Sequence, residues 1–283
     1  MQPRFKVNKL KSLVLKVTYF IQKNFPVSIE RKLCKFSLLK RLFFQVRDVV
    51  YCKKHDIVYF PIPKVACTTI SALLVQEDYS DCDFKVVSQI GIHTFRQQKT
   101  KENINSIPWI EDASHSFTVI RDPLSRLVSA YVDKMVKPFM QPDYKTQLIE
   151  NNNYSFEELV NAVCALDDCE LDKHFRPQYL FFINIQLNFI GVLAELNATF
   201  DYIAAFIDIE DKIDNVRKPK RTKYNGKSKA YAGGVKAIEL AKSGEIPHFQ
   251  HFYNEHTQNL IRARFAADMN IFEKYKHLDP LAH

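Results

Sequence analysis

The sequence predicts an α/β fold, in which a mainly parallel sheet is flanked by helices in a three-layer sandwich. Short runs of β-branched and aromatic residues alternate with longer stretches of helical apolar spacing. Such alternation favours parallel strands that are joined by crossover helices. The chain has 283 residues, of which 46% are apolar, so it can bury one large core.

The expected elements follow in order along the chain. Residues 1–50 are predicted to form a basic helical extension, and residues 51–283 a single large domain. Ser155, with Glu158 three residues later, is the pattern of a capping box, so we expect a helix to begin there. The other expected elements are strands at 56–60, 84–90, 116–120 and 189–193 and helices at 68–78, 124–136 and 250–269.

The segment 56–70, DIVYFPIPKVACTTI, predicts a strand, a tight turn and the first turn of a helix. This arrangement binds anions, because backbone N–H groups and the positive end of the helix dipole point at the ligand. Lys64 adds a positive charge, and Thr68 and Thr69 add hydroxyl donors. The GxxxxGK[ST] pattern of nucleotide-binding P-loops is absent, so the loop is of another kind.

A second strand, turn and helix are predicted in the segment 115–137, HSFTVIRDPLSRLVSAYVDKMVK. Together the two segments resemble the nucleotide signatures of sulfotransferases that use 3′-phosphoadenosine 5′-phosphosulfate (PAPS). The likeness is to the Golgi-type carbohydrate sulfotransferases and their bacterial relatives. DKHFRPQ at 172–178 and FIGVLAELNATFDYI at 189–203 resemble two further elements of that family. The resemblance implies a P-loop-like sandwich with ligands at the carboxyl ends of the strands.

The resemblance also implies which residues hold PAPS. Arg121 and Ser129 match the ligands of its 3′-phosphate, and Arg126 is either a further phosphate contact or a structural ion pair. Lys64 would also stabilise the leaving oxygen during catalysis. The residues expected at the 5′-phosphosulfate are Pro63, Lys64, Val65, Ala66, Cys67, Thr68 and Thr69.

The general base that takes the proton of the acceptor has several candidates. A histidine suits this task because its unperturbed pKa is close to neutral pH. His93 follows the second expected strand, where some relatives have their catalytic histidine, and His174 lies in DKHFRPQ. A carboxylate, such as Glu77 or Asp122, is the third possibility. These alternatives stay open on the sequence alone.

No metal is expected to take part. A sulfuryl group carries one negative charge where a terminal phosphoryl group carries about two, so lysine, hydroxyl and backbone N–H groups can neutralise it. Cys164, Cys169 and His174 lie close together in the sequence, but no fourth ligand with zinc spacing is near them.

The N-terminal segment carries most of the positive charge. Residues 1–47 hold twelve Lys and Arg and one acid, Glu30. They predict either an amphipathic arm that contacts an anionic membrane or solvated helices packed on the domain. Lys16 interrupts the longest apolar run, and no signal-peptide cleavage pattern is present. Although the Golgi relatives are typically membrane-anchored, we therefore expect a cytoplasmic protein, peripheral at most to the inner membrane face.

The sequence thus indicates a PAPS-dependent sulfotransferase that modifies a hydroxyl of a carbohydrate acceptor. Two alternatives are a P-loop-type nucleotide kinase and a non-enzymatic membrane-docking module. No nucleic-acid-binding motif is present. Residues 217–234 carry seven Lys and Arg and no acid. This segment is expected to be either a mobile lid over an anionic ligand or a solvated loop.

Overall fold

The computed structural model describes residues 49–78, 113–140, 153–183, 185–209, 224–227 and 229–276. The predicted basic extension, the strand expected at 84–90 and His93 lie outside the described residues.

The described sheet has four strands in the spatial order β1-β2-β3-β4. The pairs β2–β3 and β3–β4 are parallel, and β1 pairs with β2 in the antiparallel direction. The sheet is therefore mixed but mostly parallel, as expected, while β1 was not predicted. The strand bounds are Val50–Cys52 (β1), Ile57–Phe60 (β2), His115–Ile120 (β3) and Phe189–Val192 (β4).

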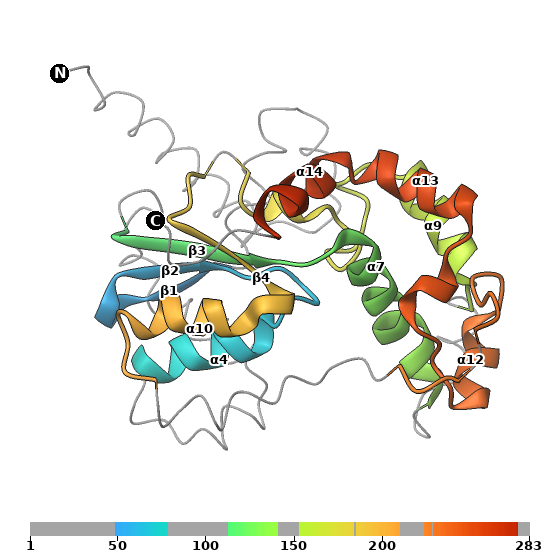
Figure 1. The fold of residues 1–283 in the computed structure, drawn as a ribbon, viewed down its shortest axis with the longest axis horizontal. Helices are drawn as coiled ribbons and strands as arrows, with labels where there is room; N and C mark the ends of the chain where they lie inside the picture. Colours follow the sequence, from blue (N-terminus) through green and yellow to red (C-terminus); the bar gives the residue numbers. More distant parts are fainter. Residues whose placement is uncertain are drawn as a thin grey trace, which may run out of the picture.

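The sheet is the middle of three layers. Helices α4 (Cys67–Asp78) and α10 (Leu196–Ala204) cover one face, and α14 (Ala266–Tyr275) crosses the other face (Figure 1). All four residues of β2 are buried, which is typical of a strand covered on both faces. The predicted sandwich with helices on both faces is confirmed.

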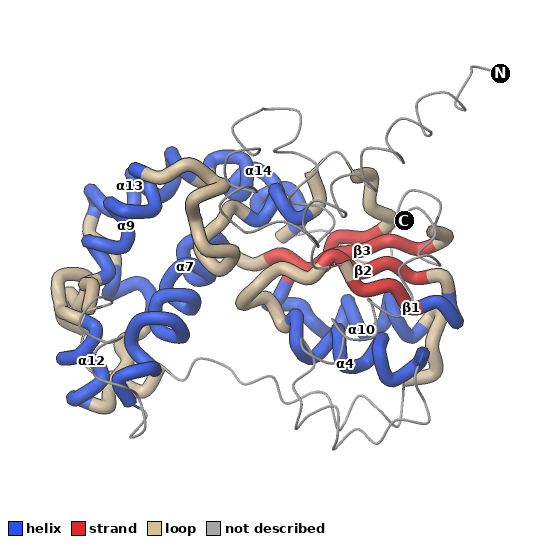
Figure 2. The backbone as a smooth tube through the Cα atoms, turned by 180° about the vertical axis from the view of Figure 1, so that it is seen from behind, coloured by secondary structure: helices blue, strands red, loops and turns tan. Residues whose placement is uncertain are grey.

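A helical lobe extends beyond the carboxyl end of β3 (Figure 2). It has its own core, in which the rings of Tyr131, Phe156 and Phe252 pack at centroid distances of 5.4–6.0 Å. Helix α7 continues directly into a π-helical turn, η3 (Val132–Val136). The helices of the lobe are α7 (Pro123–Tyr131), α9 (Phe156–Ala165), α12 (Ala237–Ser243) and α13 (Glu255–Arg264).

Two helix predictions had different outcomes. The capping box of α9 is present, with Ser155 Oγ accepting from the Glu158 backbone and the Glu158 carboxylate accepting from the Ser155 backbone. The single helix expected at 250–269 is wrong, because the chain forms a 3-10 turn and then α13 and α14. Asn254 caps α13 through the backbone N–H of Thr257, and Phe265 leaves helical geometry between the two helices.

Candidate active site

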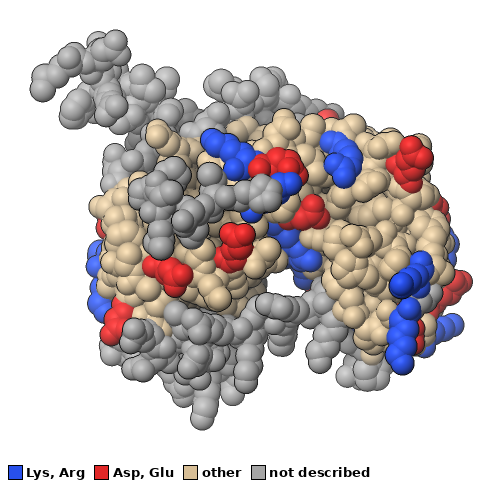
Figure 3. All heavy atoms as spheres, in the orientation of Figure 1, with Lys and Arg blue, Asp and Glu red and all other residues tan. Residues whose placement is uncertain are grey.

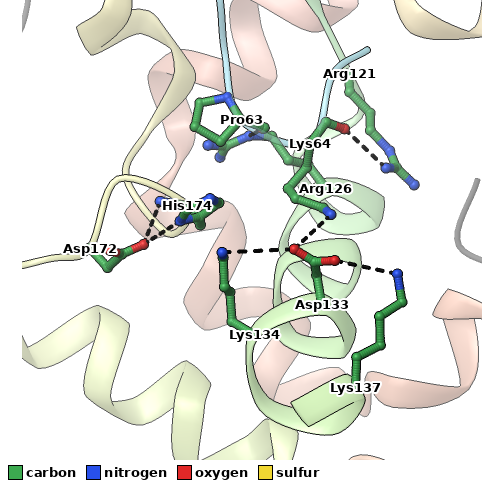
Figure 4. Close-up of polar contacts among 9 residues, drawn as sticks. All are labelled: Pro63, Lys64, Arg121, Arg126, Asp133, Lys134, Lys137, Asp172 and His174. Atoms are coloured by element: carbon green, nitrogen blue, oxygen red, sulfur yellow. Dashed lines mark hydrogen bonds and ion pairs between the residues drawn. The ribbon is translucent and has the colours of Figure 1, made fainter. Parts of the chain in front are cut away.

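The two predicted anion-binding loops lie side by side, because they follow neighbouring parallel strands. One loop leaves the carboxyl end of β2 and the other leaves that of β3. They are in direct contact, since Nη1 of Arg121 donates to the backbone oxygen of Lys64 at 3.3 Å (Figure 4). The sheet thus brings together two segments that are 57 residues apart in the sequence.

The first loop has an unusual backbone. Lys64 and Ala66 have φ angles of 70° and 50°, in the left-handed region that residues other than glycine rarely adopt. Such a conformation costs on the order of 1 kcal/mol per residue, and residues that hold it cluster at functional sites. Left-handed residues also form the backbone nests that bind anions. Helix α4 begins at Cys67, directly after the loop, so its N-terminus adds to this site.

The other predicted loop donors differ in exposure. Val65 is buried, Thr68 is exposed, and Thr69 is half-buried near the start of α4. The side chain of Val65 is therefore out of reach of a ligand, whereas Thr68 is exposed to solvent. Pro63 is also buried, and its backbone oxygen is used within the protein, as described below.

The side chain of Lys64 crosses to the helical lobe. Its Nζ lies 3.2 Å from Oδ2 of Asp133, and the other oxygen of Asp133 lies 3.3 Å from Nζ of Lys137 (Figure 4). Burial lowers the pKa of Lys64, while Asp133 acts in the opposite direction. Burial alone would raise the pKa of Asp133, but Lys64 and Lys137 hold it below its usual value. Sequence reasoning missed Asp133 because no motif connects it with the first loop.

Arg121, the first residue after β3, is held at both its side chain and its backbone. Its Nε donates to Ser125 Oγ at 2.9 Å. Its backbone N–H donates to Oε1 of Gln178 at 3.0 Å, and Nε2 of Gln178 donates back to the Arg121 backbone oxygen at 2.8 Å. Burial lowers the pKa of Arg121, and the hydroxyl of Tyr224 lies beside its guanidinium.

Ser129, the predicted partner of Arg121 at the 3′-phosphate, is buried inside α7. Ser125, four residues earlier, lies on the same face of the helix and is the serine that contacts Arg121. The position of Ser125 within RDPLSRLVSAY is the feature of the sequence that could have indicated this contact. Ser125 is therefore a further hydroxyl beside Arg121, while Ser129, one turn further along α7, stays a predicted ligand of the 3′-phosphate.

Arg126 joins the first loop to the segment 172–178. It is only 2% exposed, with Nε donating to the Pro63 backbone oxygen at 3.1 Å and Nη1 to that of Arg176 at 2.8 Å. Burial lowers the pKa of Arg126 to about 10, so it stays charged near neutral pH. Its contacts to backbone carbonyls make it a structural residue, and the alternative of a phosphate contact is not favoured.

Asp268 of α14 fixes the start of the 3-10 turn η5 (Gln178–Phe181). The backbone N–H groups of Gln178 and Tyr179 donate to its carboxylate at 2.6 and 2.9 Å. Burial raises the pKa of Asp268 to about 6 despite these bonds. The C-terminal helix therefore holds Gln178, which in turn holds Arg121, and no local pattern in the sequence indicates this connection.

His174 forms a pair with Asp172. Its Nδ1 lies 2.5 Å from Oδ1 of Asp172, which also accepts from the His174 backbone N–H. Burial alone would raise the pKa of Asp172, but the bonds from His174 lower it to about 2. An ionised Asp172 favours the proton on Nδ1, which leaves the lone pair on Nε2. Arg126 donates to the backbone oxygens of both Pro63 and Arg176. Because Arg176 is two residues after His174, the His174–Asp172 pair lies near the first loop (Figure 4).

The other candidate bases are less well placed. Glu77 lies near the C-terminal end of α4, away from the first loop, where its carboxylate pairs with Lys54 and His55. Asp122 caps α7 by accepting from the backbone N–H of Ser125. Among the candidates that the structure describes, His174 is the one whose ring is oriented by a carboxylate, as suits a general base. His93 lies outside the described residues.

A hollow opens between the sheet and the helical lobe, and Lys and Arg atoms lie along part of its wall (Figure 3). Within the described ranges, no group of His, Cys, Asp and Glu side chains is arranged to hold a metal ion. The predicted basic loop 217–234 is described only at 224–227 and 229–234. Its Tyr224 reaches Arg121, which places this part of the loop at the same site.

Curated relatives of this chain are carbohydrate sulfotransferases. Carbohydrate sulfotransferase 10 of Gallus gallus is 21% identical over 218 residues, which cover 66% of this chain and 58% of that enzyme. Its counterpart in Homo sapiens is 20% identical over 272 residues, covering 86% of this chain and 72% of that enzyme. No solved structure gives a significant match.

The prediction of a cytoplasmic protein is wrong. The relatives are Golgi carbohydrate sulfotransferases, which are lumenal enzymes. The prediction relied on the lack of a recognisable signal peptide or transmembrane segment. Such a lack is weak evidence about the compartment in which a protein is located. In the part of the chain that the structure describes, no helix is long and apolar enough to cross a membrane.

A model of the sulfotransferase family matches residues 47–276, which is most of the chain. The match includes both predicted anion-binding loops, the segment 172–178 and helix α14, which holds that segment. The order of these elements and their meeting at one end of the sheet agree with the resemblance found in the sequence. The chain therefore belongs to the sulfotransferase family.

Proposed function

We propose that the protein transfers the sulfuryl group of PAPS to a hydroxyl of a carbohydrate acceptor. The observation that carries this proposal is the contact between Arg121 and the backbone oxygen of Lys64. It brings two loops that carry Lys64 and Arg121 side by side, which supports a site for a nucleotide with anionic groups at both its 3′ and 5′ positions. The family and the carbohydrate sulfotransferase relatives support the reaction class.

In this reaction the acceptor oxygen attacks sulfur in line with the leaving group. A new S–O bond forms to the acceptor, and the bond between sulfur and the bridging oxygen of the 5′-phosphate breaks. The bond electrons leave with adenosine 3′,5′-bisphosphate. Lys64 and the backbone N–H groups of residues 65–69 stabilise the charge that develops on this product. Because the sulfuryl group carries a low charge, we expect no metal requirement.

The acceptor proton passes to a general base, for which we propose His174. Asp172 orients the ring and would stabilise the imidazolium ion that forms. His93 remains the second candidate. We also retain the division into a basic extension, 1–50, and a sulfotransferase domain, 51–283, as part of the proposal. Family membership favours this function over the nucleotide kinase and the docking module.

The test is a transfer assay with PAPS that carries labelled sulfur and a panel of glycan acceptors. Lys64→Ala and Arg121→Ala should each lower turnover by about 100-fold or more, because each removes a charge that faces an anion. Lys53→Ala is the control, since Lys53 is exposed in the turn before β2, at the end of the strands opposite to the site. Full activity of Arg121→Ala, or a requirement for ATP and magnesium, would contradict the proposal.

A further inference from the structure

The ion pair between Lys64 and Asp133 is not explained by donor binding alone. Lys64 is the residue proposed to meet the 5′-phosphosulfate, yet its Nζ is already 3.2 Å from a carboxylate oxygen. The two side chains are only 18% and 29% exposed, so water screens the pair less than it would at the surface. An anionic donor that binds Lys64 therefore has to compete with the negative charge of Asp133.

Asp133 keeps a positively charged partner if the side chain of Lys64 moves away. Its Oδ2 faces Lys64, while its Oδ1 lies 3.3 Å from Nζ of Lys137, one turn further along the helix. Nζ of Lys134 also lies 3.9 Å from Oδ2. If Lys64 moves to the donor, Lys137 still neutralises the carboxylate. The cost of leaving an unpaired, half-buried charge is thereby avoided.

The backbone that carries Asp133 is also unusual. Helix α7 ends at Tyr131, and the chain continues as the π-helical turn η3, in which the backbone N–H of Lys137 donates to the oxygen of Val132. Turns of this kind are rare and occur frequently at functional sites. This wider turn carries Asp133 and ends directly before Lys137, which is a second indication that their placement matters.

We propose that Asp133 is a positioning residue that acts through Lys64, a role that rests on the function proposed above. In the absence of the donor, its carboxylate holds the lysine ammonium across the entrance of the first loop. The phosphosulfate group then replaces the carboxylate, and Asp133 stays with Lys137. Asp133 thus lowers the affinity for the donor nucleotide while it keeps Lys64 paired between turnovers.

The experiment is calorimetric titration of the full chain with adenosine 3′,5′-bisphosphate, whose 5′-phosphate occupies the first loop. Asp133→Asn removes a competing negative charge with little change in shape, so the Kd should fall by about tenfold. Lys137→Met removes the partner of Oδ1 and leaves Asp133 with Lys64 and the more distant Lys134, so the Kd should rise several-fold. Asp133→Glu keeps the charge and should restore an affinity close to that of the wild type.

The double variant Asp133→Asn/Lys137→Met separates this role from a general charge effect. If Lys137 acts only through Asp133, Lys137→Met should not change the Kd in the Asp133→Asn background. An equal loss in both backgrounds would show that Lys137 meets the nucleotide itself, and it would overturn the proposal. An unchanged or higher Kd for Asp133→Asn would overturn it as well.

Turnover measurements distinguish Asp133 from a catalytic base. A positioning role predicts that Asp133→Asn lowers KM for the donor and changes kcat little, whereas loss of a base would lower kcat with the Kd unchanged. A wild-type chain that does not bind adenosine 3′,5′-bisphosphate would contradict the proposed function and this inference together. Wild-type binding with an additive double variant would contradict the inference alone.

Discussion

The two ends of the proposed donor site are built in different ways. At one end, Arg121 is held by Ser125 and by two hydrogen bonds with the Gln178 side chain, none of which involves a charged partner. At the other end, Lys64 has a left-handed backbone and a side chain engaged in an ion pair with Asp133. The first end is fixed before the ligand arrives, whereas at the second end the ligand meets a lysine that is already paired.

The difference in structure matches the different role of each end in the proposed reaction. The 3′-phosphate is the same in donor and product, so a rigid site can recognise it without any rearrangement. Charge at the 5′ end changes as the S–O bond breaks, so Lys64 has to bind the donor, stabilise the product and then release it. A site that combines a rigid end with an exchangeable end gives both recognition and turnover.

The largest stability effect should come from Arg126, whose bonds join the first loop to the segment 172–178, which holds Arg121 through Gln178. Arg126→Met leaves the carbonyls of Pro63 and Arg176 buried without these donors, so the free energy of unfolding should fall by about 3 kcal/mol. Urea unfolding measures this change. Arg262→Met, at an exposed position of α13, is the control. A loss below about 1 kcal/mol would mean that the two ends are held independently of Arg126.

A smaller effect of opposite sign is expected in the strained first loop. Ala66→Gly should raise the free energy of unfolding by up to about 1 kcal/mol, because glycine adopts a left-handed backbone without strain. Ala162→Gly, inside the regular helix α9, should instead lower it by about 1 kcal/mol. If both changes destabilise the protein equally, the first loop stores no strain and the contrast between the two ends is weaker.

Local patterns were sufficient to predict the central parts of the fold. Strands β2, β3 and β4 are runs of apolar residues between turn signals, and the capping box at Ser155 is complete within four residues. Strand β1 was missed because it has only three residues and depends on pairing with β2. The C-terminal helix was predicted in one piece because its apolar pattern does not show the break at Phe265.

The site was predictable in its motifs but not in its tertiary partners. The two loops are contiguous in sequence, and parallel strands bring their ends together, so Lys64 and Arg121 could be expected to meet. Asp268 lies 90 residues from Gln178, and only the docking of α14 brings them together. Asp133 is one of several charged residues that follow α7. Its contact with Lys64 depends on the π-helical turn and on the packing of the first loop, which the sequence does not show.

The most direct test of the donor site compares two nucleotides that differ only in the 3′-phosphate. Calorimetric titration with adenosine 3′,5′-bisphosphate and adenosine 5′-phosphate should show that the wild-type chain prefers the bisphosphate by about 100-fold or more. Arg121→Ala should bind both nucleotides with similar, weak affinity. Equal binding of the two nucleotides by the wild type, or an Arg121→Ala variant that keeps the preference, would contradict the assignment of Arg121 to the 3′-phosphate.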